Sequence, residues 1–99
     1  MKGNTLNEFM DDLFSLGGPE KEFIFRGRNF FLETKYDEES GCLDMCIQEY
    51  KKDENQKNIN EFHFTGSTQA ECVKAFEEAR FLDGLNIYEA ESEIEVLFG

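Results

Sequence analysis

The sequence contains no tryptophan, and it has only one proline and one histidine, Pro19 and His63. It has no apolar run long enough to span a membrane and no basic segment followed by an apolar one, so neither a transmembrane helix nor a secretory signal is expected. Its three cysteines are an odd number at irregular spacing, which is typical of a reducing cytoplasm and not of a disulfide scaffold. We therefore expect a cytoplasmic protein without membrane association.

Motifs for phosphate, nucleic-acid and calcium binding are also missing. No glycine-rich loop follows a strand pattern and opens a helix, so no phosphate cradle is indicated. No basic stripe is interleaved with aromatic residues, and direct binding of nucleic acid is not expected. The acidic clusters lack the fixed spacing of a calcium-binding loop. The sequence thus predicts no cofactor.

Acidic charge is what the sequence has in excess. Asp and Glu number 22 against 10 Lys and Arg, which gives a formal net charge of −12. Such a field repels nucleic acid and anionic membranes, and it favours encounters with basic partners. Acidity that serves only solubility is the alternative interpretation. On a helix, Glu91 and Glu95 would repel each other at i,i+4, a cost that a basic partner would relieve.

Hydrophobic periodicity predicts one domain over residues 1–99. Eleven phenylalanines supply ample core material. Thr5 with Glu8, and Thr68 with Glu71, match capping boxes that open two helices. Between these helices the apolar residues alternate with period two, which indicates strands. The expected segments are a helix over 4–16, strands over 21–26, 29–36, 42–50 and 61–65, a polar loop over 51–60, and a helix over 68–82.

The last segment, 87–98, is ambiguous. Asn86 and Glu89 form a third cap, and the apolar spacing that follows fits a helix, although 92–98 also alternates as a strand would. Helix is favoured because the cap and the longer period agree. Short polar connections favour antiparallel pairing. The predicted fold is α+β: a four-stranded antiparallel meander with helices on one face, in the order α-β-β-β-β-α-α, and with its other face uncovered.

Glycine and proline mark the predicted connections. Residues 17–19, Gly-Gly-Pro, would stop the first helix, since proline cannot continue it. Gly27 and Arg28 would form a tight turn with glycine at the first central position. Gly84 would be the C-terminal cap of the second long helix.

Cysteine and histidine are the residues most able to carry chemistry. On a strand, Cys42 and Cys46 would lie about 13 Å apart, too far to share one zinc ion or to form a disulfide. Cys72 belongs to a buried helix stripe, where thiols behave as small hydrophobes. Cys46 and His63 would meet as a thiol–imidazole pair only if their strands are neighbours, and the sequence indicates no third, orienting group. We therefore expect neither a metal site nor an enzyme.

The C-terminal half carries a pattern that consists of residues 71–76 (Glu-Cys-Val-Lys-Ala-Phe), 81–84 (Phe-Leu-Asp-Gly), 87–89 (Ile-Tyr-Glu) and 93–95 (Glu-Ile-Glu). Together with the phenylalanine-rich hairpin around Arg26, Gly27 and Arg28, it resembles a group of small acidic proteins of unassigned function from low-GC Gram-positive bacteria and their mobile elements. The resemblance covers most of the chain, and it implies no activity and no functional residues. Size and charge are also similar to those of phage-encoded inhibitors such as anti-CRISPR proteins, some of which mimic nucleic acid.

The leading functional hypothesis is a non-enzymatic module that binds a basic protein through an acidic surface, with an inhibitor or nucleic-acid mimic as its sharpest form. An immunity-type, toxin-neutralising protein is the second hypothesis, and a small enzyme that uses Cys46 or His63 is the third. A homodimer joined through the sheet is compatible with all of them. The candidate partner-binding residues are Phe31, as an aromatic anchor on the outward sheet face, and Glu38, Glu39, Glu77, Glu78, Glu91 and Glu95.

Overall fold

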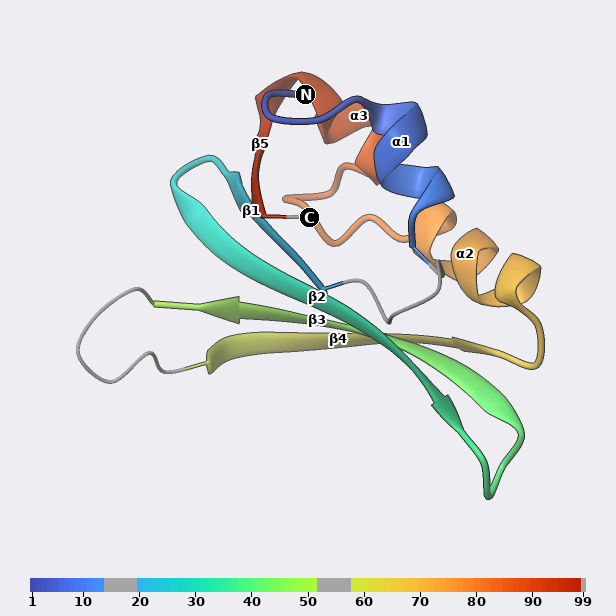
Figure 1. Cartoon of the computed structure of the whole chain (residues 1–99). Coiled ribbons are helices and arrows are strands. Elements are labelled where there is room, and N and C mark those ends of the chain that lie inside the picture. The colour runs from blue at the N-terminus through green and yellow to red at the C-terminus, as the bar shows by residue number, and fades with distance from the viewer. Residues whose placement is uncertain (14–19, 52–57, 99) are drawn as a thin grey trace.

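The computed structural model describes residues 1–13, 20–51 and 58–98 (Figure 1). The expected α+β class and the antiparallel pairing of the strands are confirmed. The sheet has five strands instead of four, in the order β4-β3-β2-β1-β5. The elements are α1 (Leu6–Asp11), β1 (Glu20–Phe25), β2 (Arg28–Asp37), β3 (Cys42–Tyr50), β4 (Asn58–Gly66), α2 (Gln69–Glu78), α3 (Ile87–Ala90), a 3-10 turn (Glu91–Glu93) and β5 (Ile94–Phe98).

The first four strands form the predicted meander. Each pairs antiparallel with the next along the chain. Strand β3 has the bounds that the alternation predicts, 42–50. Strand β4 begins at Asn58, three residues inside the predicted polar loop, and residues 52–57 of that loop lie outside the described residues. Strand β4 is longer than predicted because β3 offers nine residues of backbone to pair with.

The predicted third helix over 87–98 is wrong in its second half. The cap is correct: the Asn86 side chain accepts from the Glu89 amide, and the Glu89 carboxylate accepts from the Asn86 amide. The helix nevertheless ends at Ala90, and β5 pairs with the outer edge of β1. The backbone of Lys2 bonds the other side of β5 at Ile94 and Val96. Backbone hydrogen bonds on both sides therefore favour a strand over a helix for residues 94–98, and the alternating pattern was compatible with that strand. Glu91 and Glu95 therefore do not share a helix.

Both longer helices have the predicted threonine caps, and both end earlier than predicted. The Thr5 hydroxyl accepts from the Glu8 amide, and the Thr68 hydroxyl accepts from the Glu71 amide. Helix α1 ends at Asp11, and the predicted stop at 17–19 lies outside the described residues. Helix α2 ends at Glu78 instead of 82, because the backbone of Ala79 has an extended conformation.

Two tight turns differ from the prediction. The β1–β2 turn has Arg26 (φ 50°) and Gly27 (φ 74°) at its centre, so it lies one residue earlier than the predicted Gly27-Arg28. Positive φ at both central residues matches the twist of a hairpin. Gly84 (φ 83°) follows Asp83 (φ 54°) in a second such turn, closed by two bonds between Leu82 and Leu85. Gly84 is therefore a turn residue and not a helix cap.

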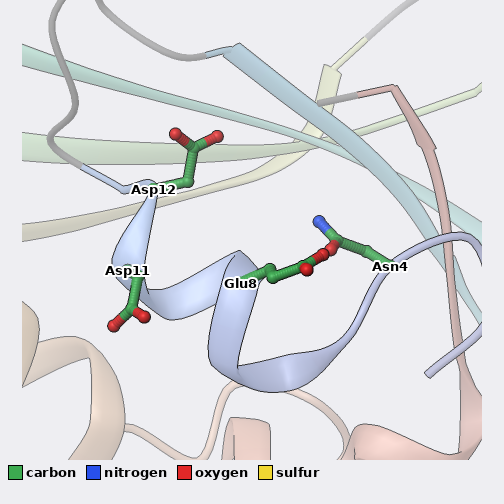
Figure 2. Close-up of a pocket in the computed structure, with 4 residues that line it drawn as sticks. All are labelled: Asn4, Glu8, Asp11 and Asp12. Carbon is green, nitrogen blue, oxygen red and sulfur yellow. The ribbon is translucent and has the colours of Figure 1, made fainter.

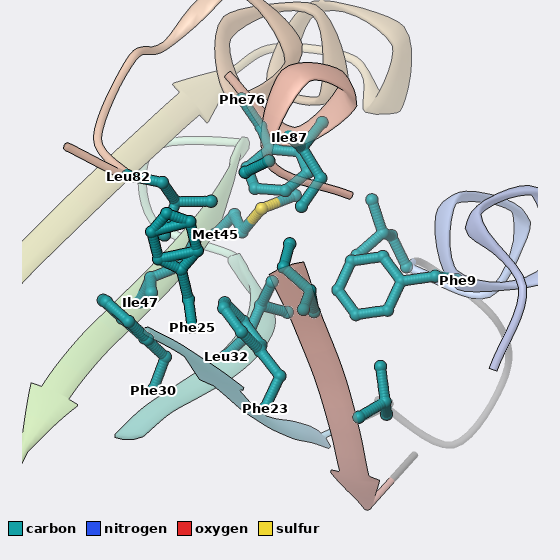
Figure 3. Packing of buried hydrophobic residues seen from close by; sticks show 14 of the residues in the cluster. Phe9, Phe23, Phe25, Phe30, Leu32, Met45, Ile47, Phe76, Leu82 and Ile87 are labelled. Atoms are coloured by element: carbon teal, nitrogen blue, oxygen red, sulfur yellow. The ribbon is translucent and has the colours of Figure 1, made fainter. Parts of the chain in front are cut away.

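The helices lie on one face of the sheet, and the core fills the space between (Figure 1, Figure 3). The rings of Phe23 and Phe30 stack at 5.2 Å between centroids, and Phe9 of α1 meets Phe23 edge-on at 6.1 Å. Figure 3 shows Phe76 and Ile87 pointing into the cluster from the helix side. The buried cluster consists of Phe9, Leu13, Phe23, Phe25, Phe30, Leu32, Met45, Ile47, Cys72, Phe76, Leu82, Ile87, Ala90, Ile94 and Val96.

Candidate functional site

The second face of the sheet is covered by none of the described helices, and we call it the open face (Figure 1). It is built by the residues that alternate with the core residues along each strand, so cross-strand register decides which of them are neighbours. Along the described strands, its charged residues are seven carboxylates, Lys35 and His63. The seven carboxylates are Glu20, Glu22, Glu33, Asp37, Asp44, Glu61 and Glu95, and they come from all five strands.

Phe31 is the central aromatic residue of the open face. It is half-buried on β2, and the two residues that pair with it across the sheet are Glu22 on β1 and Gln48 on β3. Glu33 follows two residues later on the same face. The predicted outward position of Phe31 is confirmed. An aromatic side chain surrounded by carboxylate and amide groups has the composition of an interface centre with a polar rim.

The acidic residues singled out from the sequence lie in separate places. Glu38 and Glu39 are in the β2–β3 turn, and Glu77 and Glu78 are at the end of α2. The remaining two are near β5: Glu91 has its Oε1 3.7 Å from the N-terminal amine, and Glu95 lies on the open face beside Ile24. In Figure 1 the β2–β3 turn and α3 are at opposite ends of the molecule. These six residues therefore do not form one band of charge.

Arg26 and Arg28 form ion pairs with carboxylates of the same chain. Arg26 lies in the β1–β2 turn and forms two bonds to Glu93, at 2.9 and 2.8 Å. Arg28 binds Glu49 through two bonds, at 3.0 and 2.8 Å, and both arginines contact Asp83. The pairs with Glu93 and Asp83 join the hairpin to the segment between α2 and β5, and the pair with Glu49 joins β2 to β3. Among the described residues, no arginine bonds to an open-face carboxylate.

Glu49 is a buried acid that sequence reasoning missed. Its residue is only 5% exposed, and its carboxylate also accepts from the Asn60 side chain at 3.0 Å. The Arg28 guanidinium holds the pKa of Glu49 below its ordinary value, although burial works in the opposite direction. The signal was available: continuing the β3 alternation of Met45 and Ile47 by two residues places Glu49 on the core side.

A polar cluster of Asp44, Cys46, Glu61 and His63 occupies the β3–β4 part of the open face, and we call it the Cys46 cluster. Cys46 and His63 are direct partners across the two strands. The distance from Cys46 Sγ is 3.9 Å to His63 Nε2 and 3.4 Å to Glu61 Oε1, and His63 Nε2 lies 3.6 Å from Glu61 Oε1. On its other side, His63 Nδ1 lies 3.2 Å from Asp44 Oδ2. Gln48 Nε2 donates to Glu61 at 3.1 Å.

The thiol–imidazole pair forms because β3 and β4 are neighbouring strands. Asp44 is the orienting group that the sequence analysis did not identify. It lies two residues before Cys46, so strand alternation places both side chains on the same face. The arrangement Asp44–His63–Cys46 has the order of a nucleophilic triad.

Electrostatics oppose nucleophilic chemistry at this cluster. Burial raises the pKa of Cys46 to about 11, with further increases from its hydrogen bond to Glu61 and from the charges of Asp44 and Glu33. The side chain is nearly buried, at 3% exposure. A nucleophilic cysteine needs a lowered pKa and an electropositive, accessible setting. The cluster is suited to holding a cation, which would offset the surrounding negative charge.

A second acidic feature lies at α1, where a hollow of about 340 Å³ is lined by Asn4, Glu8, Asp11 and Asp12. Figure 2 shows Asn4 and Glu8 pointing toward each other, while Asp11 and Asp12 point in different directions. Asp12 is also bound by Lys21 at 3.1 Å. The carboxylates therefore do not converge on one point, and the hollow adds only to the acidity of the surface.

In comparisons with protein-family models, curated proteins and solved structures, the chain has no significant match. None of the helices among the described residues is long and apolar enough to cross a membrane. Functional inference therefore depends on the geometry of the open face and of the Cys46 cluster.

Proposed function

We propose that the chain is a non-enzymatic binding module that engages a basic protein through the open face, with Phe31 as the anchor. The observation that carries this proposal is the uncovered sheet face itself, where a half-buried aromatic residue is surrounded by carboxylates. Interfaces of this kind concentrate binding energy in a central aromatic residue and draw specificity from a polar rim. A cytoplasmic location, expected from the cysteine content, belongs to the same proposal.

Charge placement supports a basic partner. The open face carries carboxylates from every strand, and Lys35, its lysine, is already 3.3 Å from Glu33. Glu20 and Glu33 are direct cross-strand partners, and like charges in that position destabilise a sheet. Lysine or arginine side chains of a bound protein would relieve this repulsion. The acidic field would also accelerate encounter with a basic surface.

A binding role fits the site better than catalysis does. The Cys46 thiol is protonated at neutral pH, because its pKa is raised to about 11. Lys35 lies opposite Asp44 on β2, but its ammonium group pairs with Glu33. Burial and the neighbouring carboxylates hold the pKa of Cys46 above its ordinary value despite this lysine. A triad order without an activated nucleophile carries no acyl-transfer chemistry.

The proposal is tested by site-specific photocrosslinking in cells. A photoreactive phenylalanine analogue replaces Phe31 in one variant and Tyr88 in the other. Tyr88 is a matched control because it is an aromatic residue that is 48% exposed and lies on α3, on the helix side of the sheet. We expect position 31 to capture one basic protein, with capture that weakens as salt is raised, because screening weakens exposed ion pairs. Position 88 should not capture it.

The identity of the captured protein distinguishes between the possible forms of this function. Displacement of the captured protein by duplex DNA would establish the nucleic-acid-mimic form, in which the module inhibits a nucleic-acid-handling protein of a mobile-element host. Capture of a toxin would establish the immunity-type form. Capture of a second copy of the chain would make the open face a homodimer interface. Equal labelling from positions 31 and 88, or no adduct from either, would leave acidity with a solubilising role and contradict the proposal.

A further inference from the structure

We propose that Cys46, Glu61 and His63 form a zinc-binding site on the open face, with Asp44 as the residue that orients the histidine. The inference is independent of the proposed protein partner, because it rests on three side chains of this chain alone. Their ligand atoms, one sulfur, one oxygen and one nitrogen, all lie within 4.8 Å of one another. Thiolate, carboxylate and imidazole are the three ligand types that zinc uses in proteins.

The spacing of the three ligand atoms matches tetrahedral zinc. Bonds of ~2.3 Å to sulfur and ~2.0–2.2 Å to nitrogen and oxygen, at tetrahedral angles, place ligand atoms about 3.4–3.6 Å apart. The observed separations are 3.4 Å for Cys46–Glu61, 3.6 Å for Glu61–His63 and 3.9 Å for Cys46–His63. Each is within a few tenths of an ångström of the expected edge, so small side-chain rotations would close the site.

Strand register explains why the three residues converge. Cys46 and His63 are opposite each other on β3 and β4, and Glu61 is two residues from His63 on the same face. The antiparallel pairing of β3 with β4 is regular from Leu43 to Glu49, so the ligand backbones are fixed. Sites on such elements are more precise than sites on loops.

The residues around the three ligands hold them in place, as outer-shell residues do in metal-binding proteins. His63 presents Nε2 to the ligand cluster, while Nδ1 lies 3.2 Å from the Asp44 carboxylate. This carboxylate–histidine arrangement fixes the ring and is the usual outer shell of a zinc histidine. Gln48 holds the Glu61 carboxylate from the other side, at 3.1 Å. Asp44, Glu61 and Glu33 place negative charge around Cys46, which a dication would offset.

The exposure of the ligand side chains decides whether an ion can reach the site, and the number of ligands decides how many coordination positions stay open. The side chains of His63 and Glu61 are 48% and 50% exposed, so an ion can enter from solvent above the nearly buried Cys46. On binding, the Cys46 S–H bond breaks, its proton passes to solvent, and the sulfur bonds to the metal. Three protein ligands leave the fourth tetrahedral position to water or to a side chain of a bound protein, the pattern of an open zinc site.

The site is tested by titrating the full chain with cobalt and with zinc, with a phosphine present to keep the cysteines reduced. Co²⁺ is the spectroscopic probe, because a thiolate ligand gives a charge-transfer band and four-coordination gives intense visible bands. We expect one Co²⁺ per chain, displaced by Zn²⁺. Cys46→Ser should abolish the charge-transfer band, and Asp44→Asn should weaken binding by about 10–100-fold, as is usual for outer-shell partners.

Cys42→Ser is the matched control, since it makes the same change on the same strand, four residues away and outside the cluster. It should keep both the band and the affinity. Because Glu61 and His63 are half exposed, Glu61→Gln and His63→Gln should keep the fold and lose at least tenfold in affinity. They remain informative if a cysteine variant fails to fold.

NMR gives a second readout on the unmodified chain. His63 is the single histidine of the sequence, so one pair of imidazole signals reports the site. These signals should move with saturating, one-to-one Zn²⁺. The proposal is overturned if the chain gives no thiolate–cobalt band, if Cys46→Ser retains the band, if Cys42→Ser loses it, or if the imidazole signals do not respond to zinc.

Discussion

The two faces of one sheet differ in nearly every physical respect. On the inner face, Phe23, Phe30 and Ile47 are fully buried beneath the helices. On the open face the same strands present carboxylates, a half-buried Phe31 and the Cys46 cluster. Along β2 the faces alternate residue by residue, so two neighbours such as Phe30 and Phe31 have different roles. The comparison teaches that stability belongs to one face and recognition to the other.

Charge follows the same division. At the hairpin end of the inner face, Arg28 and Glu49 neutralise each other within a partly buried network. On the open face, Glu20 and Glu33 are paired with like charge across β1 and β2. A protein selected only for stability would gain by removing that repulsion. Its presence is therefore consistent with a face kept for a cationic ligand or partner.

The largest expected effect comes from truncating the inner face. Phe23→Ala should lower the free energy of unfolding by about 3–5 kcal/mol, since it empties the centre of a fully buried aromatic stack. The matched change on the open face, Phe31→Ala, should cost less, about 1 kcal/mol, because the ring is only partly buried. Urea unfolding measures both. Equal losses would mean that the two faces do not divide stability in this way.

The next effect comes from the buried ion pair. Glu49→Gln should lower the free energy of unfolding by about 2–3 kcal/mol, because Arg28 loses a charged, doubly bonded partner. Glu33→Gln makes the same change on the open face and should shift stability by less than about 0.5 kcal/mol. Thermal unfolding of both variants at pH 7 gives the comparison, which fails if Glu33→Gln is the more damaging change.

Acid dependence sharpens this result. Arg28 holds the pKa of Glu49 below its ordinary value of about 4.3, so the stabilisation is complete above that pH and is lost as pH falls through the lower folded pKa. Stability of the natural sequence should therefore fall steeply below about pH 4. Glu49→Gln should show a shallower fall over the same range in urea titrations. Parallel acid curves would contradict the assignment.

A smaller effect is expected from the helix that covers the inner face. Thr68→Ala removes the hydroxyl that accepts from the Glu71 amide, and it should cost about 1 kcal/mol. Ser92→Ala, at an exposed residue of the 3-10 turn, is the control and should be neutral. Thermal melts compare the two, and a neutral Thr68→Ala would show that the cap adds nothing to the packing of α2.

The smallest effect should have the opposite sign. Glu20→Gln removes the repulsion with Glu33 while leaving the Lys35–Glu33 pair intact, so it should stabilise the chain by a few tenths of a kcal/mol. It should also weaken capture of the basic partner. A destabilised variant in urea titrations would show that Glu20 serves the fold and not recognition.

Much of the fold was predictable because short strands have a strong local signal. The bounds of β3 and the caps at Thr5, Thr68 and Asn86 follow from alternation and from side-chain chemistry. Strand β5 was not predicted, because its partner is the edge of β1, about seventy residues earlier, and period alone cannot reveal such pairing. The one-residue error at Arg26 reflects turn chemistry in which a non-glycine residue adopts positive φ.

The candidate site was predictable in part for the same reason. Alternation placed Phe31, Cys46 and His63 outward, which is where they lie. The meeting of Cys46 with His63 depended on which strands pair, and the roles of Asp44 and Glu61 depended on register. The acidic residues chosen by local density are scattered over three regions, since sequence clustering does not place turns and helix ends side by side.

The central claim is that the open face recognises a partner while the inner face holds the fold. Its most direct test is the affinity of the captured protein for Phe31→Ala and for Tyr88→Ala, two aromatic truncations on opposite sides of the sheet. The account predicts at least a tenfold loss, about 1.4 kcal/mol, for Phe31→Ala and no loss for Tyr88→Ala. Undiminished binding by Phe31→Ala, or a loss confined to Tyr88→Ala, would contradict it.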